Sequence, residues 1–528
     1  MKTQKNRLSS TIAAAALLAI AAPSLSWAED TLRVLTHADL KNIDPVWTTA
    51  GITIEHGYMI YDKLFEFDAT GKAQPQMAES LEVSADGLTN TIKLRDGLQF
   101  SDGTLVTAKD VIQSLKRWST RDPLGQVMAG LTKDMTALDD RTVQITLTEP
   151  FGLLPDALAG IRGNPAFIMP ERVANTDPAE QLTDSTGSGP FLFDLKAWKP
   201  GEPVIYKRNP DYKSRSEPQD FYAGGKVAGF DQVQFQYLPD PNTAMSAMIS
   251  GEADIWELPP NDLALSLKDT PGLTVERGSS AHGVIRPNHL VPPFDNPKAR
   301  QALYYLVDQS QVLAGAVGDP ALWQVCGAYL TCDSTYESDA GIQGVTVPAD
   351  IEKAKQLLKE GGYSGQPIVI LDPTDLSDLH AVSLYMAQQL RAAGANVDLQ
   401  AMDWSTLTSR RSVKEPADKG GWNLMPTYLG GLEASSPLTN QALATSCDKA
   451  WFGWPCDEKL EALRTEWRRE PDLEKRKDIA RQIQERAYEV VPYVPYGQFF
   501  TMIVRKDNLK GFRADAPMPI YWGVSRVQ

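Results

Sequence analysis

The chain has 528 residues, of which 42% are hydrophobic and 23% charged, and its formal net charge at pH 7 is −15. This length exceeds the roughly 250–300 residues at which one hydrophobic core stops growing, so we expect two or three lobes. The acidic balance argues against nucleic acid and anionic membrane surfaces as partners.

The first residues, 1–28, have the pattern of a secretory signal peptide. Three basic residues precede an apolar run over 12–22, and the small-x-small sequence SWA ends at Ala28. We predict cleavage after Ala28, which removes three basic and no acidic residues and changes the net charge from −15 to −18. No cysteine stands at the cleavage site, so we expect an exported chain without a lipid anchor.

The segment 77–118 predicts two strands and a helix joined by tight turns. The pair Asp86-Gly87 separates two β-prone runs, as a hairpin turn does, and two further Asp-Gly pairs follow. Thr107 is placed to cap a helix, with Asp110 three residues later as its partner in a capping box. Apolar residues then recur at helical spacing.

Downstream, the sequence alternates between predicted helices and strands. Two amphipathic helices are expected over 457–490, broken near Pro471. A strand, a helix and a second strand in succession imply parallel pairing in an α/β lobe. The other predicted helices are 297–309, 351–360 and 380–393, and the predicted strands are 367–371 and 396–401.

Four cysteines occur as two pairs that are close in the sequence, Cys326 with Cys332 and Cys447 with Cys456. An even number of cysteines in an exported chain favours disulfides over free thiols. Three connectivities are possible, and we favour the two local ones. Neither spacing is that of a zinc site, and no histidine lies near either pair, so we predict no metal site and no cofactor.

The segment 77–118 also carries a family resemblance. Its sequence "ESLEVSADGLT…KLRDGLQFSDGT…TAKDV" closely resembles the signature of the family-5 extracellular solute-binding proteins, which are the dipeptide, oligopeptide and nickel receptors of ATP-binding-cassette (ABC) importers. Further segments resemble motifs of the same family, in the same order: 188–191, 208–212, 248–255, 288–308 and 350–363.

The resemblance implies an α/β, bilobal periplasmic-binding-protein-like fold of type II, in the large peptide-receptor subclass, with a third small domain inserted. Two strands would cross between the lobes near Gly283 and Tyr496 and act as a hinge. The expected division is lobe I from 29–61, 185–281 and 498–528, the inserted small domain from 62–184, and lobe II from 282–497.

The implied function is that of a periplasmic receptor that captures a peptide or peptide-like solute between two lobes. It would act as a monomer and deliver the solute to an inner-membrane ABC permease. The alternative is the same role for an opine, a glycoside, haem or a metal chelate. An exported hydrolase is a remote alternative, because the chain contains no G-x-S-x-G, H-E-x-x-H or P-loop motif.

The loop 430–437 resembles the family loop "W-x-x-D-x-x-D-P", whose first Asp binds the free α-amine of a peptide. Glu433 stands at that position, four residues before Pro437, while Gly430 replaces the Trp and Ser436 the second acid. Glu433 is therefore interpreted either as the partner of a ligand ammonium group or as a solvated loop residue.

Arg411 could hold a ligand carboxylate through two parallel hydrogen bonds. The alternative is an ion pair with Asp or Glu on a helix surface. Aromatic residues that flank the Glu433 loop could line the cleft or pack in a core. The complete predicted ligand-binding set is Thr49, Gly51, Trp404, Arg411, Trp422, Tyr428, Leu429, Gly430 and Glu433.

Overall fold

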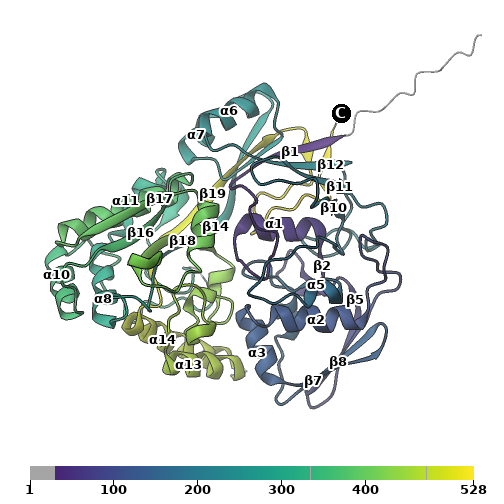
Figure 1. Ribbon diagram of the computed structural model, residues 1–528, viewed down its shortest axis with the longest axis horizontal. Coiled ribbons are helices and arrows are strands. Elements are labelled where there is room, and N and C mark those ends of the chain that lie inside the picture. The colour runs from purple at the N-terminus through teal and green to yellow at the C-terminus, as the bar shows by residue number, and fades with distance from the viewer. Residues whose placement is uncertain (1–29, 333, 471, 528) are drawn as a thin grey trace, which may run out of the picture.

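The computed structural model describes residues 30–332, 334–470 and 472–527, so the predicted signal peptide lies outside the described residues. Two lobes lie side by side, one built mainly from the green part of the chain and the other from its purple and blue part (Figure 1). None of the described helices is long and apolar enough to cross a bilayer.

A mixed sheet of 11 strands runs through both lobes. Its strands are β1 (Thr31–Thr36), β10 (Phe191–Phe193), β11 (Val204–Arg208), β12 (Gln232–Tyr237), β13 (Ile255–Glu257), β14 (Leu273–Pro287), β15 (Trp323–Gln324), β16 (Ile368–Pro373), β17 (Val397–Met402), β18 (Leu424–Gly430) and β19 (Val494–Lys506). The strand order is β10-β11-β12-β1-β13-β19-β14-β18-β16-β17, with β15 on β19.

Strands β14 and β19 join the two halves of this sheet. On one side β19 pairs with β13, and on the other β14 pairs with β18. Between these regions the two long strands pair with each other, and their register shifts next to Gly283. A Cβ atom on Gly283 would lie 2.4 Å from Cε2 of Tyr496, so only glycine lets this ring cross the neighbouring strand. Strands β14 and β19 therefore cross between the two halves of the sheet near Gly283 and Tyr496, the two points that the resemblance predicted.

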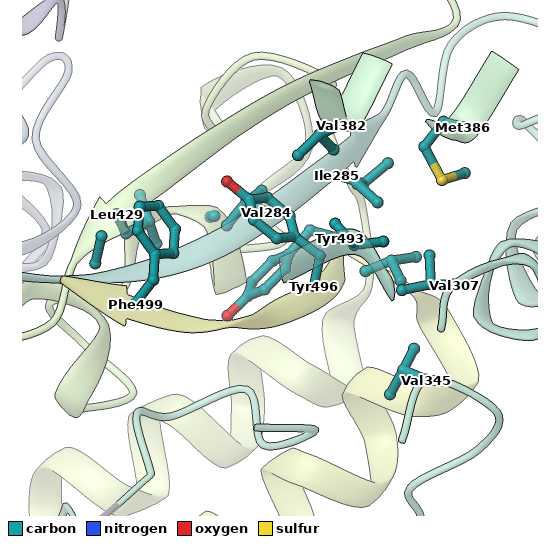
Figure 2. Close-up of a cluster of buried hydrophobic side chains, with 14 of the residues drawn as sticks. Val284, Ile285, Val307, Val345, Val382, Met386, Leu429, Tyr493, Tyr496 and Phe499 are labelled. Carbon is teal, nitrogen blue, oxygen red and sulfur yellow. The ribbon is translucent and has the colours of Figure 1, made fainter. Parts of the chain in front are cut away.

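The helices of lobe II pack around a core that includes Val284, Tyr493 and Tyr496 (Figure 2). Strands β16 and β17 are parallel, as predicted. The helix predicted over 297–309 ends at Leu306, and a second helix begins at Gln309, because Asp308 accepts a hydrogen bond from the N–H of Gln311 and caps it. The helices are α8 (Pro297–Leu306), α9 (Gln309–Ala316), α10 (Ile351–Glu360), α11 (Ser377–Ala392), α12 (Trp404–Arg410), α13 (Glu458–Arg469) and α14 (Leu473–Val490).

A small four-stranded sheet with its own helices lies beside lobe I and forms a separate core between Leu64 and Ile168, inside the predicted range 62–184. The predicted hairpin and helix cap are confirmed: the N–H of Thr107 donates to Asp110 Oδ2 at 2.7 Å. The sheet order is β5-β6-β8-β7. The elements are β5 (Ala78–Val83), β6 (Thr89–Leu94), α2 (Ala108–Trp118), α3 (Pro123–Leu131), β7 (Thr132–Asp139), β8 (Thr142–Leu147) and α4 (Leu154–Leu158).

Shorter elements complete the two lobes and the small domain. They are α1 (Gly51–Ile60), β2 (Asp62–Lys63), β3 (Phe65–Phe67), β4 (Ala73–Pro75), β9 (Phe167–Ile168), α5 (Glu171–Ala174), α6 (Pro241–Ser250), α7 (Asn261–Ser266), β20 (Leu509–Lys510) and β21 (Ser525–Arg526). Both predicted disulfides, Cys326–Cys332 and Cys447–Cys456, are present. The second closes the loop that carries Trp451.

Candidate ligand-binding site

Most of the predicted ligand-binding residues converge on one cavity between the lobes, which we call the central cavity. One wall comes from residues 37–54 and 162–163, and the opposite wall from lobe II between 376 and 451. The cavity lies beside the end of β18, which carries Tyr428 and Leu429. The predicted residues that line it are Thr49, Gly51, Trp404, Arg411, Tyr428, Leu429 and Glu433.

The other two predicted residues lie close by but outside the central cavity. Gly430 lines an adjoining cavity, and a Cβ atom there would lie 2.8 Å from Cδ of Arg162, so glycine in place of the family's Trp makes room for that side chain. Trp422 is completely buried, and its Nε1–H donates to the carbonyl oxygen of Arg411 at 3.1 Å. Trp422 therefore helps to position Arg411 through this hydrogen bond to its backbone.

Arg411 follows the last residue of α12 and is 2% exposed. Its Nη2 donates to Thr49 Oγ1 at 2.9 Å, whereas its Nε has no hydrogen-bond partner within 30–332, 334–470 and 472–527. Among the described residues Arg411 forms no salt bridge, so the alternative of an ion pair on a helix surface is wrong. Burial lowers the pKa of the Arg411 guanidinium to about 9, so it is charged at neutral pH. The cavity therefore contains a buried cation without a protein counter-charge.

Two aromatic rings hold the Arg411 guanidinium in place. Its Cζ lies 4.6 Å from the centre of the Phe452 ring and 5.4 Å from that of Trp451. The Nε1–H of Trp451 donates to Thr49 Oγ1 at 3.2 Å, so one hydroxyl on lobe I contacts both side chains on lobe II. Cation–π contacts stabilise a charge less than an anion does, because the ring offers only a quadrupole.

Glu433 begins a short 3-10 helix, Glu433–Ser435, and its side chain is 8% exposed. One carboxylate oxygen accepts from Gln441 Nε2 at 2.7 Å, and the other accepts from the N–H of Gly430 at 3.3 Å. That second oxygen lies 3.8 Å from Arg162 Nε. The interpretation as a solvated loop residue is therefore wrong. Burial raises the pKa of Glu433, and the positive charge of Arg162 opposes this rise.

A second cavity adjoins the central one and contains three residues that the sequence analysis missed: His37, Glu55 and Glu257. His37 Nδ1 lies 3.2 Å from Glu257 Oε2 and 3.5 Å from Glu55 Oε1. His37 directly follows β1 and Glu257 ends β13, and these neighbouring strands are parallel. Only the pairing of these two strands in the tertiary structure brings His37 and Glu257 together, and no pattern in the sequence pointed to Glu55.

The two lobes are closed on each other around these cavities. Lys41 Nζ contacts Asp403 Oδ1 at 2.5 Å, and the hydroxyl of Ser405 donates to the carbonyl oxygen of Asp39 at 2.7 Å. The hydroxyl of Tyr237 also reaches across and donates to Asp375 Oδ2 at 2.7 Å. A solute in the central cavity would be enclosed by both lobes, which is the geometry of a receptor that closes on its ligand.

Comparisons with known proteins agree with this geometry. Residues 72–450 match the family described as bacterial extracellular solute-binding proteins, family 5. A probable peptide ABC transporter periplasmic-binding protein, y4tO of Sinorhizobium fredii, is 39% identical over 505 residues, which cover 95% of this chain and 94% of the relative.

Solved structures share the fold at lower identity. AgaA of A. tumefaciens R10, solved with agropinic acid, is 23% identical with a TM-score of 0.79, and the match covers 94% of this chain and 99% of AgaA. The oligopeptide-binding protein AppA of Bacillus subtilis, solved with a nonapeptide, is 19% identical with a TM-score of 0.77, and covers the same shares of both chains. The type II bilobal fold is therefore confirmed.

Proposed function

The chain belongs to the bacterial extracellular solute-binding proteins of family 5, which are receptors of ABC importers and not enzymes, and from this membership we propose that its solute is a peptide or peptide-like acid bound through a carboxylate. The name of the Sinorhizobium relative, a probable peptide-binding protein, supports a peptide. A membrane permease is the partner that receives the solute. We also propose a monomer, exported to the periplasm after loss of residues 1–28.

Arg411 is the observation that carries this proposal. Burying a charged group without a counter-ion costs several kcal/mol, and a carboxylate in good geometry offsets most of that cost. Arg411 lines the central cavity, its Nε–H has no hydrogen-bond partner among the described residues, and the rings of Trp451 and Phe452 fix its plane. A carboxylate on the solute would supply the missing counter-charge.

The same observation supplies a mechanism for ligand-dependent closure. Arg411 on lobe II contacts Thr49 on lobe I, so the two groups meet only when the lobes close. In an open form the guanidinium would be hydrated, and closure without solute would remove that water without providing an anion. A solute carboxylate removes this penalty, binds the closed form better than the open form, and thereby shifts the population toward closure.

Glu433 favours a second candidate within the same class. Its carboxylate already accepts from Gln441 and lies beside Arg162, so a free α-amine would have to compete with these groups. A peptide-like acid with a substituted amine, such as an opine, needs no such competition. A peptide with a free amine remains our first candidate, because Glu433 lines the central cavity together with Arg411.

Calorimetry tests the proposal. A panel of dipeptides, tripeptides and opines is titrated into the protein after partial unfolding and refolding to remove bound solute. The best binder is then compared with its C-terminal amide. We expect the amide to bind at least about 30-fold more weakly, because a buried cation loses its partner. Arg411→Gln should lose a similar factor and should no longer distinguish the acid from the amide.

Arg410→Gln is the matched control. Arg410 precedes Arg411 in the chain, but it donates to the carbonyl oxygens of Gly420 and Gly421 and does not line the central cavity. It should retain wild-type affinity. Equal affinity of wild type and Arg411→Gln for the acid would refute the proposed role of Arg411.

A further inference from the structure

The cavity that adjoins the central cavity has a donor set with no assigned role. It contains one imidazole nitrogen, from His37, and the carboxylates of Glu55 and Glu257, and one atom from each lies within 4.8 Å of the others. All three residues come from lobe I, and they lie on separate elements: His37 after β1, Glu55 in α1 and Glu257 at the end of β13. The set is therefore complete without help from lobe II.

The carboxylates of Glu55 and Glu257 are buried, although burying a charged group is unfavourable unless a counter-charge compensates for the loss of water. Glu55 is 3% exposed and Glu257 is 2% exposed. One carboxylate oxygen of Glu55, Oε2, is buried without a hydrogen-bond partner in the part of the chain that the structure describes. A divalent cation would satisfy the unpaired oxygen and neutralise both carboxylates.

We propose that His37, Glu55 and Glu257 form a binding site for a divalent transition-metal ion of the zinc class. An imidazole nitrogen with two carboxylate oxygens is a donor set that suits such ions. The proposal goes beyond the solute-binding function and does not depend on which solute is bound.

The spacing of the donor atoms favours a metal ion over an ammonium group. In a tetrahedral site with bonds of about 2.0–2.2 Å, neighbouring donor atoms lie about 3.3–3.6 Å apart. An ammonium group with acceptors at about 2.8 Å would hold them about 4.6 Å apart. The two separations from His37 Nδ1, 3.2 Å and 3.5 Å, are closer to the metal value than to the ammonium value. The shorter one is also the length of the hydrogen bond between His37 and Glu257, which a bound metal ion would replace.

Neighbouring residues orient the donors. The hydroxyl of Tyr521 donates to Glu257 Oε1, which leaves Oε2 facing His37. A hydrogen bond of this kind to a ligating carboxylate is typical of metal sites. A Cβ atom on Gly51 would lie 3.1 Å from His37 Nε2, so glycine leaves space for the imidazole ring. The open side of the cluster faces the adjoining cavity, where water or the solute could supply a fourth ligand.

Zinc binding to the whole mature protein tests the proposal. The protein is treated with a chelator, and Zn²⁺ alone is titrated in competition with a chromophoric indicator. We expect one Zn²⁺ per chain in the wild type. Affinity should fall at least about 100-fold in His37→Gln and Glu55→Gln, and about 10–100-fold in Tyr521→Phe. Co²⁺ in place of Zn²⁺ should give the intense visible absorption of a tetrahedral site.

Two control variants make the result specific. His380 Nδ1 lies 2.7 Å from Asp372 Oδ1, and no third ligand of this kind completes the pair among the residues that the structure describes. His380→Gln should therefore keep full Zn²⁺ affinity. Arg411→Gln should also keep it, which separates this proposal from the proposed function. Circular dichroism checks that each variant is folded, and if Glu55→Gln is not, His37→Gln and Tyr521→Phe decide. Absence of stoichiometric Zn²⁺ binding in the wild type, or binding unchanged in His37→Gln, would overturn the proposal.

Discussion

Replacing Arg411 by Met should shift the ligand-free protein toward the closed form. Burial lowers the pKa of the guanidinium from 12.5 to about 9. At 1.36 kcal/mol per pKa unit, this corresponds to a penalty of about 5 kcal/mol for the charged form in the closed state. Because the folded pKa is depressed, the penalty is complete below about pH 9 and disappears only as the pH rises from about 9 to 12.5.

Favourable contacts of Arg411 offset part of this penalty. The two cation–π contacts and the hydrogen bond to Thr49 together contribute about 2–3 kcal/mol. The difference leaves about 2–3 kcal/mol that opposes closure. Met fills a similar volume without the charge, so Arg411→Met should change the ratio of closed to open molecules by about 30–150-fold in favour of closure.

Small-angle scattering measures this change directly. The radius of gyration is determined for ligand-free wild type, Arg411→Met and the control Arg410→Met at neutral pH. We expect an expanded wild type that compacts on addition of the solute, a control like the wild type, and a compact Arg411→Met without solute. An equally expanded Arg411→Met would refute the argument that the uncompensated charge holds the lobes apart, as would a wild type already compact without solute.

Three further predictions concern stability. Glu433→Gln should destabilise the protein by about 1–3 kcal/mol in urea unfolding, because Arg162 loses a buried counter-charge; unchanged stability would show that the pair contributes nothing. Asp122 has its pKa raised from 3.8 to about 7 by burial, so the wild type should lose stability as the pH rises through this range. Asp122→Asn keeps a side chain that can cap the helix but removes the titrating carboxyl, so the melting temperature should depend less on pH than in the wild type. An unchanged pH dependence would contradict the raised pKa of Asp122. Replacing Cys447 and Cys456 together by Ser should cost about 2–3 kcal/mol in chemical denaturation, and a smaller solute affinity should accompany it; full stability would mean that the loop is held by packing alone.

Local chemistry explains why much of the fold could be predicted. The Asp86-Gly87 turn and the Thr107 cap depend on residues that are neighbours in the chain, and both are present. The helix predicted over 297–309 runs past the end of α8 at Leu306, although Asp308, which caps α9, is also a local signal. The family motifs then supplied the lobe order, which no local signal contains.

Part of the candidate site was also predictable. The loop 430–437, which resembles a family motif, offered Glu433 as a partner of a ligand ammonium group, and the guanidinium of Arg411 was a candidate partner of a ligand carboxylate. Both residues line the central cavity. Their electrostatic state was not predictable. Whether a charge is buried, and what lies beside it, depends on atoms that are distant in the sequence: Arg411 contacts Thr49 from the other lobe, and Glu433 lies beside Arg162.

The sequence by itself therefore determined the family and the bilobal α/β fold, because both rest on an ordered series of motifs. It favoured the local disulfide pairs, and the structure selected them from three possible connectivities. Only the tertiary structure decided which charges lack partners. His37, Glu55 and Glu257 lie in three separate segments, and parallel pairing of β1 with β13 brings two of them to the same edge of the sheet. The cost of burying a charge is a property of its three-dimensional surroundings, and residue order alone does not reveal it.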